Sequence, residues 1–83
     1  MDTQQLTLIL QAAFPQADVF VSGQGGKFDL RIVDDRFEGQ RTLVRQQAVY
    51  APLNHYIASG ELHAVTIRAM TKEEWRKASL FGA

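Results

Sequence analysis

The sequence predicts one α+β domain, residues 1–83, with elements in the order α-β-β-α(kinked)-β-α. Three observations support this fold class. Apolar residues recur every three or four positions in some segments, which is the helical period, and alternate with polar residues in others, which is the strand period. A chain of 83 residues accommodates one modest core. No linker, repeat or low-complexity segment divides it.

Residues 3–14 are predicted to form the first helix. Asp2 or Thr3 can cap its start, and Pro15 ends it, because proline has no backbone N–H to donate. The apolar residues with helical spacing are Leu6, Ile9, Leu10, Ala13 and Phe14.

Two strands are predicted next, at residues 18–22 and 27–33, and we expect them to pair as a hairpin. The first is rich in residues with high β-propensity, and the second alternates apolar and polar side chains. The segment between them, Gly23-Gln24-Gly25-Gly26, contains the Gly-x-x-Gly pattern of the nucleic-acid clamp in KH domains. That clamp joins two helices, whereas this segment joins two strands, so a hairpin turn is the favoured interpretation. A mobile glycine loop beside a binding site is the alternative.

The longest helical region is predicted at residues 42–58. Pro52 interrupts it, which predicts either a kink or two short helices with Pro52 opening the second. Gly60 is well placed to end the region. The predicted inner stripe consists of Val49, Leu53, Tyr56 and Ile57.

A third strand is predicted at residues 63–70, with His63, Val65, Ile67 and Ala69 on one face. Thr71 and Glu74 fit a capping box that begins a final helix. We expect Trp75 to anchor this helix to the sheet as part of the core.

The composition argues against several classes of protein. Nine basic and nine acidic residues cancel, which counts against strong non-specific binding of nucleic acid. No apolar run approaches the length of a membrane helix, which is about 20 residues. The N-terminal residues lack the pattern of a signal peptide, so we expect a cytoplasmic protein with no membrane partner.

Catalytic motifs are also missing from the sequence, and we predict that the protein is not an enzyme. It has no cysteine, no Gly-x-Ser-x-Gly nucleophile motif and no phosphate-binding glycine loop that ends in Lys-Ser/Thr. Asp34 and Asp35 are adjacent carboxylates, but neighbouring side chains on extended chain point apart. We interpret them as a solvated turn.

His63 is the candidate metal ligand. The absence of cysteine excludes thiolate sites and any self-contained iron–sulfur cluster, so a metal would have to be shared with another molecule. The structural alternative is a strand-end histidine whose ring makes a backbone hydrogen bond. His55, in the helical region, is interpreted as a partly exposed surface residue.

Arg41 and Arg45 are four residues apart and would share one face of a helix. That spacing could grip phosphates, yet it also describes an ordinary solvated face, which we favour. Interleaved acidic residues weaken any continuous positive field.

The combined spacing of several fragments, which covers nearly the whole chain, resembles the BolA-like family. Within that family it is most similar to the IbaG branch, which has a similar Gln-Gln-x-Val-Tyr-x-Pro-Leu stretch, here residues 46–53. The fragments are Phe37-x-Gly39, Arg45, Val49-Tyr50-x-Pro52-Leu53, Ile57, Leu62-His63-Ala64-Val65 and Thr71-x-x-x-Trp75.

The resemblance implies a three-stranded sheet with helices, related to class II KH domains. It also implies a monothiol glutaredoxin as partner. In such pairs the glutaredoxin cysteine and a glutathione sulfur ligate a [2Fe–2S] cluster, and the BolA-like protein contributes a histidine, which corresponds to His63. Many members have a second ligand, His or Cys, at the position of Lys27 in this chain. A protonated lysine is no ligand for iron, so we expect a more labile or differently ligated cluster. Lys27 could instead contact glutathione carboxylates or an acidic partner.

Members of the family are also described as transcriptional regulators, which is the alternative function. The corresponding DNA-binding surface would span residues 39–53, with Arg41 and Arg45 nearest to phosphate. Whether the chain forms a homodimer stays open at this point.

Overall fold

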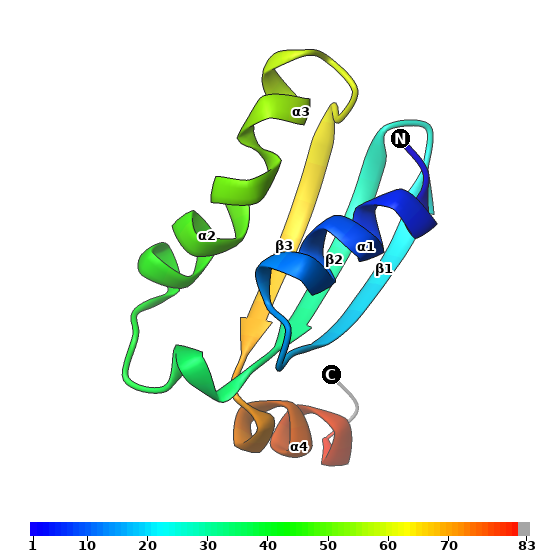
Figure 1. The fold of residues 1–83 in the computed structure, drawn as a ribbon. Coiled ribbons are helices and arrows are strands. Elements are labelled where there is room, and N and C mark those ends of the chain that lie inside the picture. Colours follow the sequence, from blue (N-terminus) through cyan, green and yellow to red (C-terminus); the bar gives the residue numbers. More distant parts are fainter. Residues whose placement is uncertain (82–83) are drawn as a thin grey trace.

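The computed structural model describes residues 1–81 and confirms the α+β class and the predicted order of elements (Figure 1). The predicted helix at 42–58 consists of two short helices separated by a 3₁₀ turn, and a further 3₁₀ turn precedes it. The elements are α1 (Thr3–Ala13), β1 (Asp18–Gln24), β2 (Lys27–Val33), η1 (Asp35–Phe37), α2 (Thr42–Tyr50), η2 (Ala51–Leu53), α3 (Asn54–Ala58), β3 (Ala64–Met70) and α4 (Lys72–Leu80).

The three strands form a mixed sheet in the order β1-β2-β3. β1 and β2 are an antiparallel hairpin, as predicted, and β3 pairs with β2 in parallel. A parallel neighbour needs a crossover connection, and the segment from η1 to α3 provides it. The parallel register pairs Lys27 with Ala64, so the start of β3 lies beside the hairpin turn.

Helices α1, α2 and α3 lie on one face of the sheet, and the core is between them and the strands (Figure 1). Alternation in β2 sends Phe28, Leu30 and Ile32 into this core and leaves the other face of the sheet to more exposed side chains. The buried apolar side chains of the core are Leu6, Leu10, Phe14, Ala17, Phe28, Leu30, Ile32, Phe37, Val49, Leu53, Leu62 and Ile67.

The hairpin turn is tighter than predicted. β1 continues through Gly23 and Gln24, so only Gly25 and Gly26 form the loop. Their φ angles are +64° and +81°, and positive φ at both positions is the requirement of a two-residue type I′ hairpin. Two consecutive glycines meet that requirement without strain, which lets the strand pairing extend to Gln24 and Lys27.

The helix break at Pro52 is confirmed, but one member of the predicted inner stripe is wrong. Val49 and Leu53 are fully buried and Tyr56 is half-buried, whereas Ile57 is 37% exposed. Ile57 is the penultimate residue of α3 and lines a surface depression. Ile57 therefore leaves the core.

The final helix is capped as predicted but attaches to the sheet differently. The Thr71 hydroxyl accepts a hydrogen bond from the Glu74 N–H, and the Glu74 carboxylate accepts one from the Thr71 N–H. Trp75 is only half-buried and lies outside the core cluster. It contacts Phe20 and Arg31 on the outer face of the sheet, because α4 lies at the end of the sheet and not over its core face.

None of the helices formed by residues 1–81 is both long and apolar enough to span a membrane.

Candidate functional site

The backbone around His63 is anchored to the hairpin turn and to α3. The N–H groups of His63 and Ala64 both donate to the Gly26 carbonyl, at 2.9 and 3.1 Å. Just before them, the Leu62 N–H donates to the Tyr56 carbonyl, and the Leu62 side chain is 1% exposed. His63 therefore precedes β3 on a fixed stretch of backbone.

The imidazole ring of His63 lies directly over Gly26. A Cβ atom added at Gly26 would come within 3.1 Å of the ring Cγ and 3.3 Å of Nδ1, closer than ordinary packing allows. His63 is exposed, and no side-chain hydrogen bond to its ring occurs among residues 1–81. The expected backbone hydrogen bond to the ring, which was the structural alternative, is not formed in this part of the chain. The ring nitrogens are available to an external group.

A shallow apolar depression of about 240 Å³ adjoins the ring. Its walls come from α2, α3 and the start of β3, and its residues are Tyr50, Ile57, His63, Ala64 and Val65. The exposure of Ile57, which the helical period did not predict, gives this depression an apolar wall. A side chain from another molecule could pack here while a second group reaches the imidazole.

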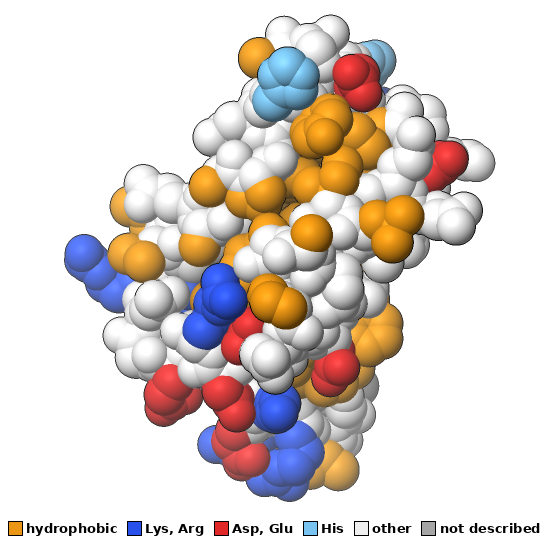
Figure 2. Space-filling view, viewed as in Figure 1, with side chains coloured by type: hydrophobic (Ala, Val, Ile, Leu, Met, Phe, Trp, Pro, Cys, Tyr) orange, Lys and Arg blue, Asp and Glu red, His pale blue; other side chains and the backbone are white. Residues whose placement is uncertain are grey.

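Lys27 and His55 are at the same end of the molecule as His63, but neither contributes to a ligand cluster. Lys27 is exposed at the start of β2, where it follows Gly26 and pairs with Ala64. His55 is exposed on α3 and packs edge-on against Tyr56, with ring centroids 5.4 Å apart. Figure 2 shows both histidines of the chain at this end, with apolar side chains below them in that view.

The available donors fit a shared metal site and do not fit a resident one. No group of three or more His, Cys, Asp or Glu side chains that could hold a metal occurs among the residues the structure describes. A structural zinc site usually takes four protein ligands. His63 can offer one imidazole ligand to a metal whose other ligands come from a partner.

Arg45, one of the two candidate phosphate ligands, is not on a solvated face. Its guanidinium forms a two-point ion pair with Glu74, donates through Nη1 to the Ala69 carbonyl at 3.1 Å, and donates through Nε to the Gln40 carbonyl at 2.9 Å. The Arg45 side chain is 13% exposed. Arg41 precedes α2, is exposed and makes no side-chain capping bond. Of these two arginines, only Arg41 therefore remains an exposed candidate for binding phosphate.

The prediction of a solvated turn at Asp34 and Asp35 is wrong for Asp34. The Asp34 N–H donates to the Met70 carbonyl at 2.8 Å, which extends the strand contact and buries the residue to 6% exposure. Its carboxylate accepts the Arg36 N–H. Asp35 is exposed and accepts the Lys72 N–H at 3.0 Å. Both carboxylates serve the junction between β2, η1 and α4 and do not face each other as an acid–base pair.

Sequence reasoning missed two contributors to the site, Gly26 and Ile57. The sequence favours a turn at Gly26 and does not indicate that its lack of a side chain makes room for the ring of His63. The two consecutive glycines before β2 predict a tight turn, but they do not predict which side chain packs on that turn.

The fold and site define a class of protein: a small α+β domain with a mixed sheet, helices on one face, and one exposed histidine ahead of the parallel edge strand. Residues 8–74 match the family described as BolA-like protein, and the chain belongs to the BolA-like family.

Similar proteins agree with this assignment. The chain is 78% identical to a protein of Acinetobacter guillouiae described as an uncharacterized protein in the rpoN-murA intergenic region, over 100% of both chains. It is 38% identical to the acid stress protein IbaG of Escherichia coli K12, over 93% of this chain and 92% of that protein. A solved structure of a bolA protein homologue from Coxiella burnetii superimposes with a TM-score of 0.80 at 25% identity, covering 92% of this chain and 97% of that chain.

Proposed function

We propose that this protein is a non-enzymatic, cytoplasmic adaptor that pairs with a monothiol glutaredoxin and contributes His63 to a shared [2Fe–2S] cluster. The observation that carries the proposal is the exposed His63 ring, which lies over Gly26 and has no hydrogen-bond partner among residues 1–81, in a chain without cysteine. The thiolate ligands would come from the glutaredoxin and glutathione, and the cluster is cargo that the pair maintains or transfers.

Physical chemistry gives His63 a specific role in such a pair. Imidazole in place of thiolate raises the reduction potential of an iron–sulfur centre. The apolar depression beside His63 would receive part of the partner surface, and its exposed Ile57 supports that use. The similarity to an acid stress protein supports a stress-response role for the same adaptor.

Lys27 is the second contributor in this proposal. It replaces a potential ligand with a cation that cannot bind iron, next to the Gly26 turn that supports His63. We infer that Lys27 contacts a glutathione carboxylate or an acidic partner surface. Lys27→Gln should then weaken the pair at low salt and reduce its salt dependence, since a screened ion pair would be lost.

The test is reconstitution of a cluster on a monothiol glutaredoxin with glutathione, followed by addition of this protein. The visible circular dichroism of the cluster should change when the wild type is added and should stay unchanged when His63→Ala is added. The control variant His55→Ala should produce the same change as the wild type. Both substitutions are at exposed positions, so stability should change by no more than about 0.5 kcal/mol. A wild-type protein that leaves the spectrum unchanged would refute the proposal.

A further inference from the structure

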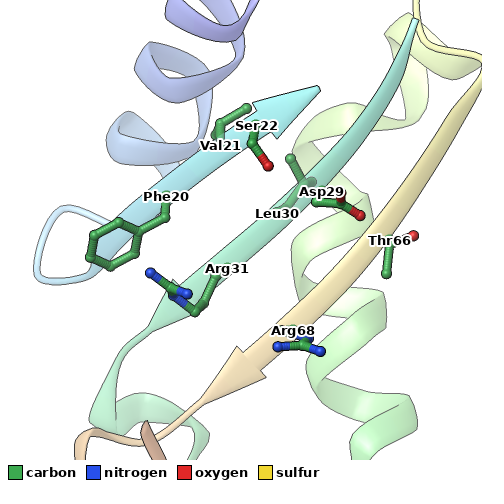
Figure 3. A pocket seen from close by; sticks show the side chains of 8 residues that line it. All are labelled: Phe20, Val21, Ser22, Asp29, Leu30, Arg31, Thr66 and Arg68. Carbon is green, nitrogen blue, oxygen red and sulfur yellow. The ribbon is translucent and has the colours of Figure 1, made fainter. Parts of the chain in front are cut away.

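The face of the sheet opposite the helices carries a hollow of about 430 Å³ that is distinct from the His63 site (Figure 3). We call it the open-face hollow. Its outward-facing side chains come from all three strands: Phe20, Ser22, Asp29, Arg31, Thr66 and Arg68. His63 precedes Arg68 by five residues, which is roughly 16 Å along a strand. The two sites are therefore separate.

The guanidinium of Arg31 is held between two aromatic rings. Its central carbon is 3.9 Å from the centroid of the Trp75 ring and 4.2 Å from that of Phe20. These contacts fix the plane of the guanidinium but do not neutralise its charge. The Nε atom is buried and has no hydrogen-bond partner, although a buried polar group normally has one.

A second guanidinium is on the neighbouring strand. Arg68 is the register partner of Arg31 in the parallel β2–β3 pair, and paired residues share one face of a sheet. Neither arginine takes part in an ion pair with another residue of the described part of the chain. Two arginines at paired positions, neither of them in an ion pair, favour an oxyanion, because each guanidinium can donate two parallel hydrogen bonds to a carboxylate or phosphate.

The other end of the hollow has the opposite preference. Asp29 is two residues from Arg31 on the same face, and its partners across the sheet are Ser22 and Thr66, whose side chains are hydroxyls. The distance from Asp29 to Arg31 along the strand is about 7 Å. A carboxylate at that position repels a second anionic group and favours a hydrogen-bond donor, such as an ammonium or hydroxyl group.

We propose that the open-face hollow binds a small molecule with an oxyanion at one end and an amino or hydroxyl group a few atoms away. Arg31 and Arg68 hold the oxyanion, which is a phosphate or a carboxylate. Asp29, with the Ser22 and Thr66 hydroxyls, holds the donor end. The aromatic pair Phe20 and Trp75 keeps Arg31 in place before the ligand arrives, so little side-chain entropy is lost on binding.

The single tryptophan of the chain, Trp75, provides the readout, because it contacts Arg31. Its fluorescence is followed while phosphoethanolamine, ethyl phosphate, 4-aminobutyrate and butyrate are added separately at constant ionic strength. We expect a saturable change, with each amino compound binding more tightly than its counterpart without the amino group. The phosphate and carboxylate pairs distinguish the two sources of the oxyanion.

Arg68→Gln is the decisive variant, because Arg31→Gln would also remove both ring contacts. Loss of one charged donor should weaken binding about tenfold. Arg41→Gln, which removes an exposed cation at the start of α2, should leave the affinity unchanged. Asp29→Asn should reduce the preference for the amino compounds. The proposal would be overturned if none of the four compounds gave a saturable change, or if Arg68→Gln and the wild type had equal affinity. Arg31 would then serve only to attach α4 to the sheet through Trp75.

Discussion

At the scale of single residues, His63 and Gly26 act as one unit. In the proposed pair the ring would be the cluster ligand, and a side chain at Gly26 would crowd the ring from the turn beneath it. His63 could be identified from the sequence, since it belongs to the matched family pattern and cysteine is absent. Gly26 could not be assigned this role, because the contact depends on the parallel register of two strands that are far apart in the chain.

The first prediction compares Gly26→Ala with Gly25→Ala. Both positions have positive φ, so each alanine should lower the free energy of unfolding by about 1–2 kcal/mol, measured by urea denaturation. Only Gly26→Ala should displace the His63 ring, because nothing lies within 4 Å of a Cβ atom at Gly25. The ring resonances of His63 should therefore shift in Gly26→Ala and stay in place in Gly25→Ala.

Equal ring shifts in the two variants would mean that backbone strain, and not the added methyl group, controls the ring. In the glutaredoxin assay, Gly26→Ala should impair the spectral change more than Gly25→Ala does, at matched fractions of folded protein.

At the scale of elements, local patterns predicted which segments become helices and strands, and long-range contacts decided how they are used. The capping box at Thr71 and Glu74 and the break at Pro52 are local features, and both were predictable. The role of Arg45 was not, because its partners Ala69 and Glu74 come from β3 and α4. Ile57 was misplaced because the helical period does not show which positions near the end of a helix are covered by other elements.

The second prediction concerns the Arg45–Glu74 pair, which connects α2 to α4. Two hydrogen bonds lower the pKa of Glu74 below its ordinary value of 4.5. The larger effect comes from the Arg45 side chain and the smaller one from the Thr71 backbone. A lowered folded-state pKa stabilises the protein above the unfolded-state value, and this contribution is lost as the pH falls through the folded-state pKa. Because the Glu74 side chain is 48% exposed, solvent screening limits the contribution to about 1 kcal/mol.

Urea unfolding of the wild type and Glu74→Gln from pH 7 to pH 2 checks this expectation. The wild type should be more stable at pH 7, and the difference should vanish at pH values well below 4.5. Glu73→Gln is the matched control, since Glu73 pairs with Arg76 in the same helix, α4, and both side chains are largely exposed. A pH-independent difference for Glu74→Gln would assign the effect to packing instead of charge.

At the scale of the whole molecule, the one-sided arrangement of helices separates the two regions proposed to bind partners or ligands. The helices cover one face of the sheet and leave the other open, while the hairpin turn and α3 form one end of the molecule (Figure 1). The histidines lie at that end, and many charged side chains gather at the opposite end (Figure 2). The α+β order was predictable from periodicity. The open face was not, because the sequence pattern of each strand does not reveal which helices cover it.

The last prediction is that the two regions act independently. Effects at sites more than about 10 Å apart without shared partners usually add to within about 0.5 kcal/mol, which is roughly a twofold change in an equilibrium constant. His63→Ala should therefore leave the affinity of the open-face hollow for phosphoethanolamine within about twofold of the wild type. Arg68→Gln should likewise leave the glutaredoxin-dependent change in visible circular dichroism unaltered. The double variant should show both losses at the sizes measured singly. A larger mutual effect would require β3, which connects His63 to Arg68, to change its position or register when either region is occupied, and hydrogen exchange along β3 would reveal such a change.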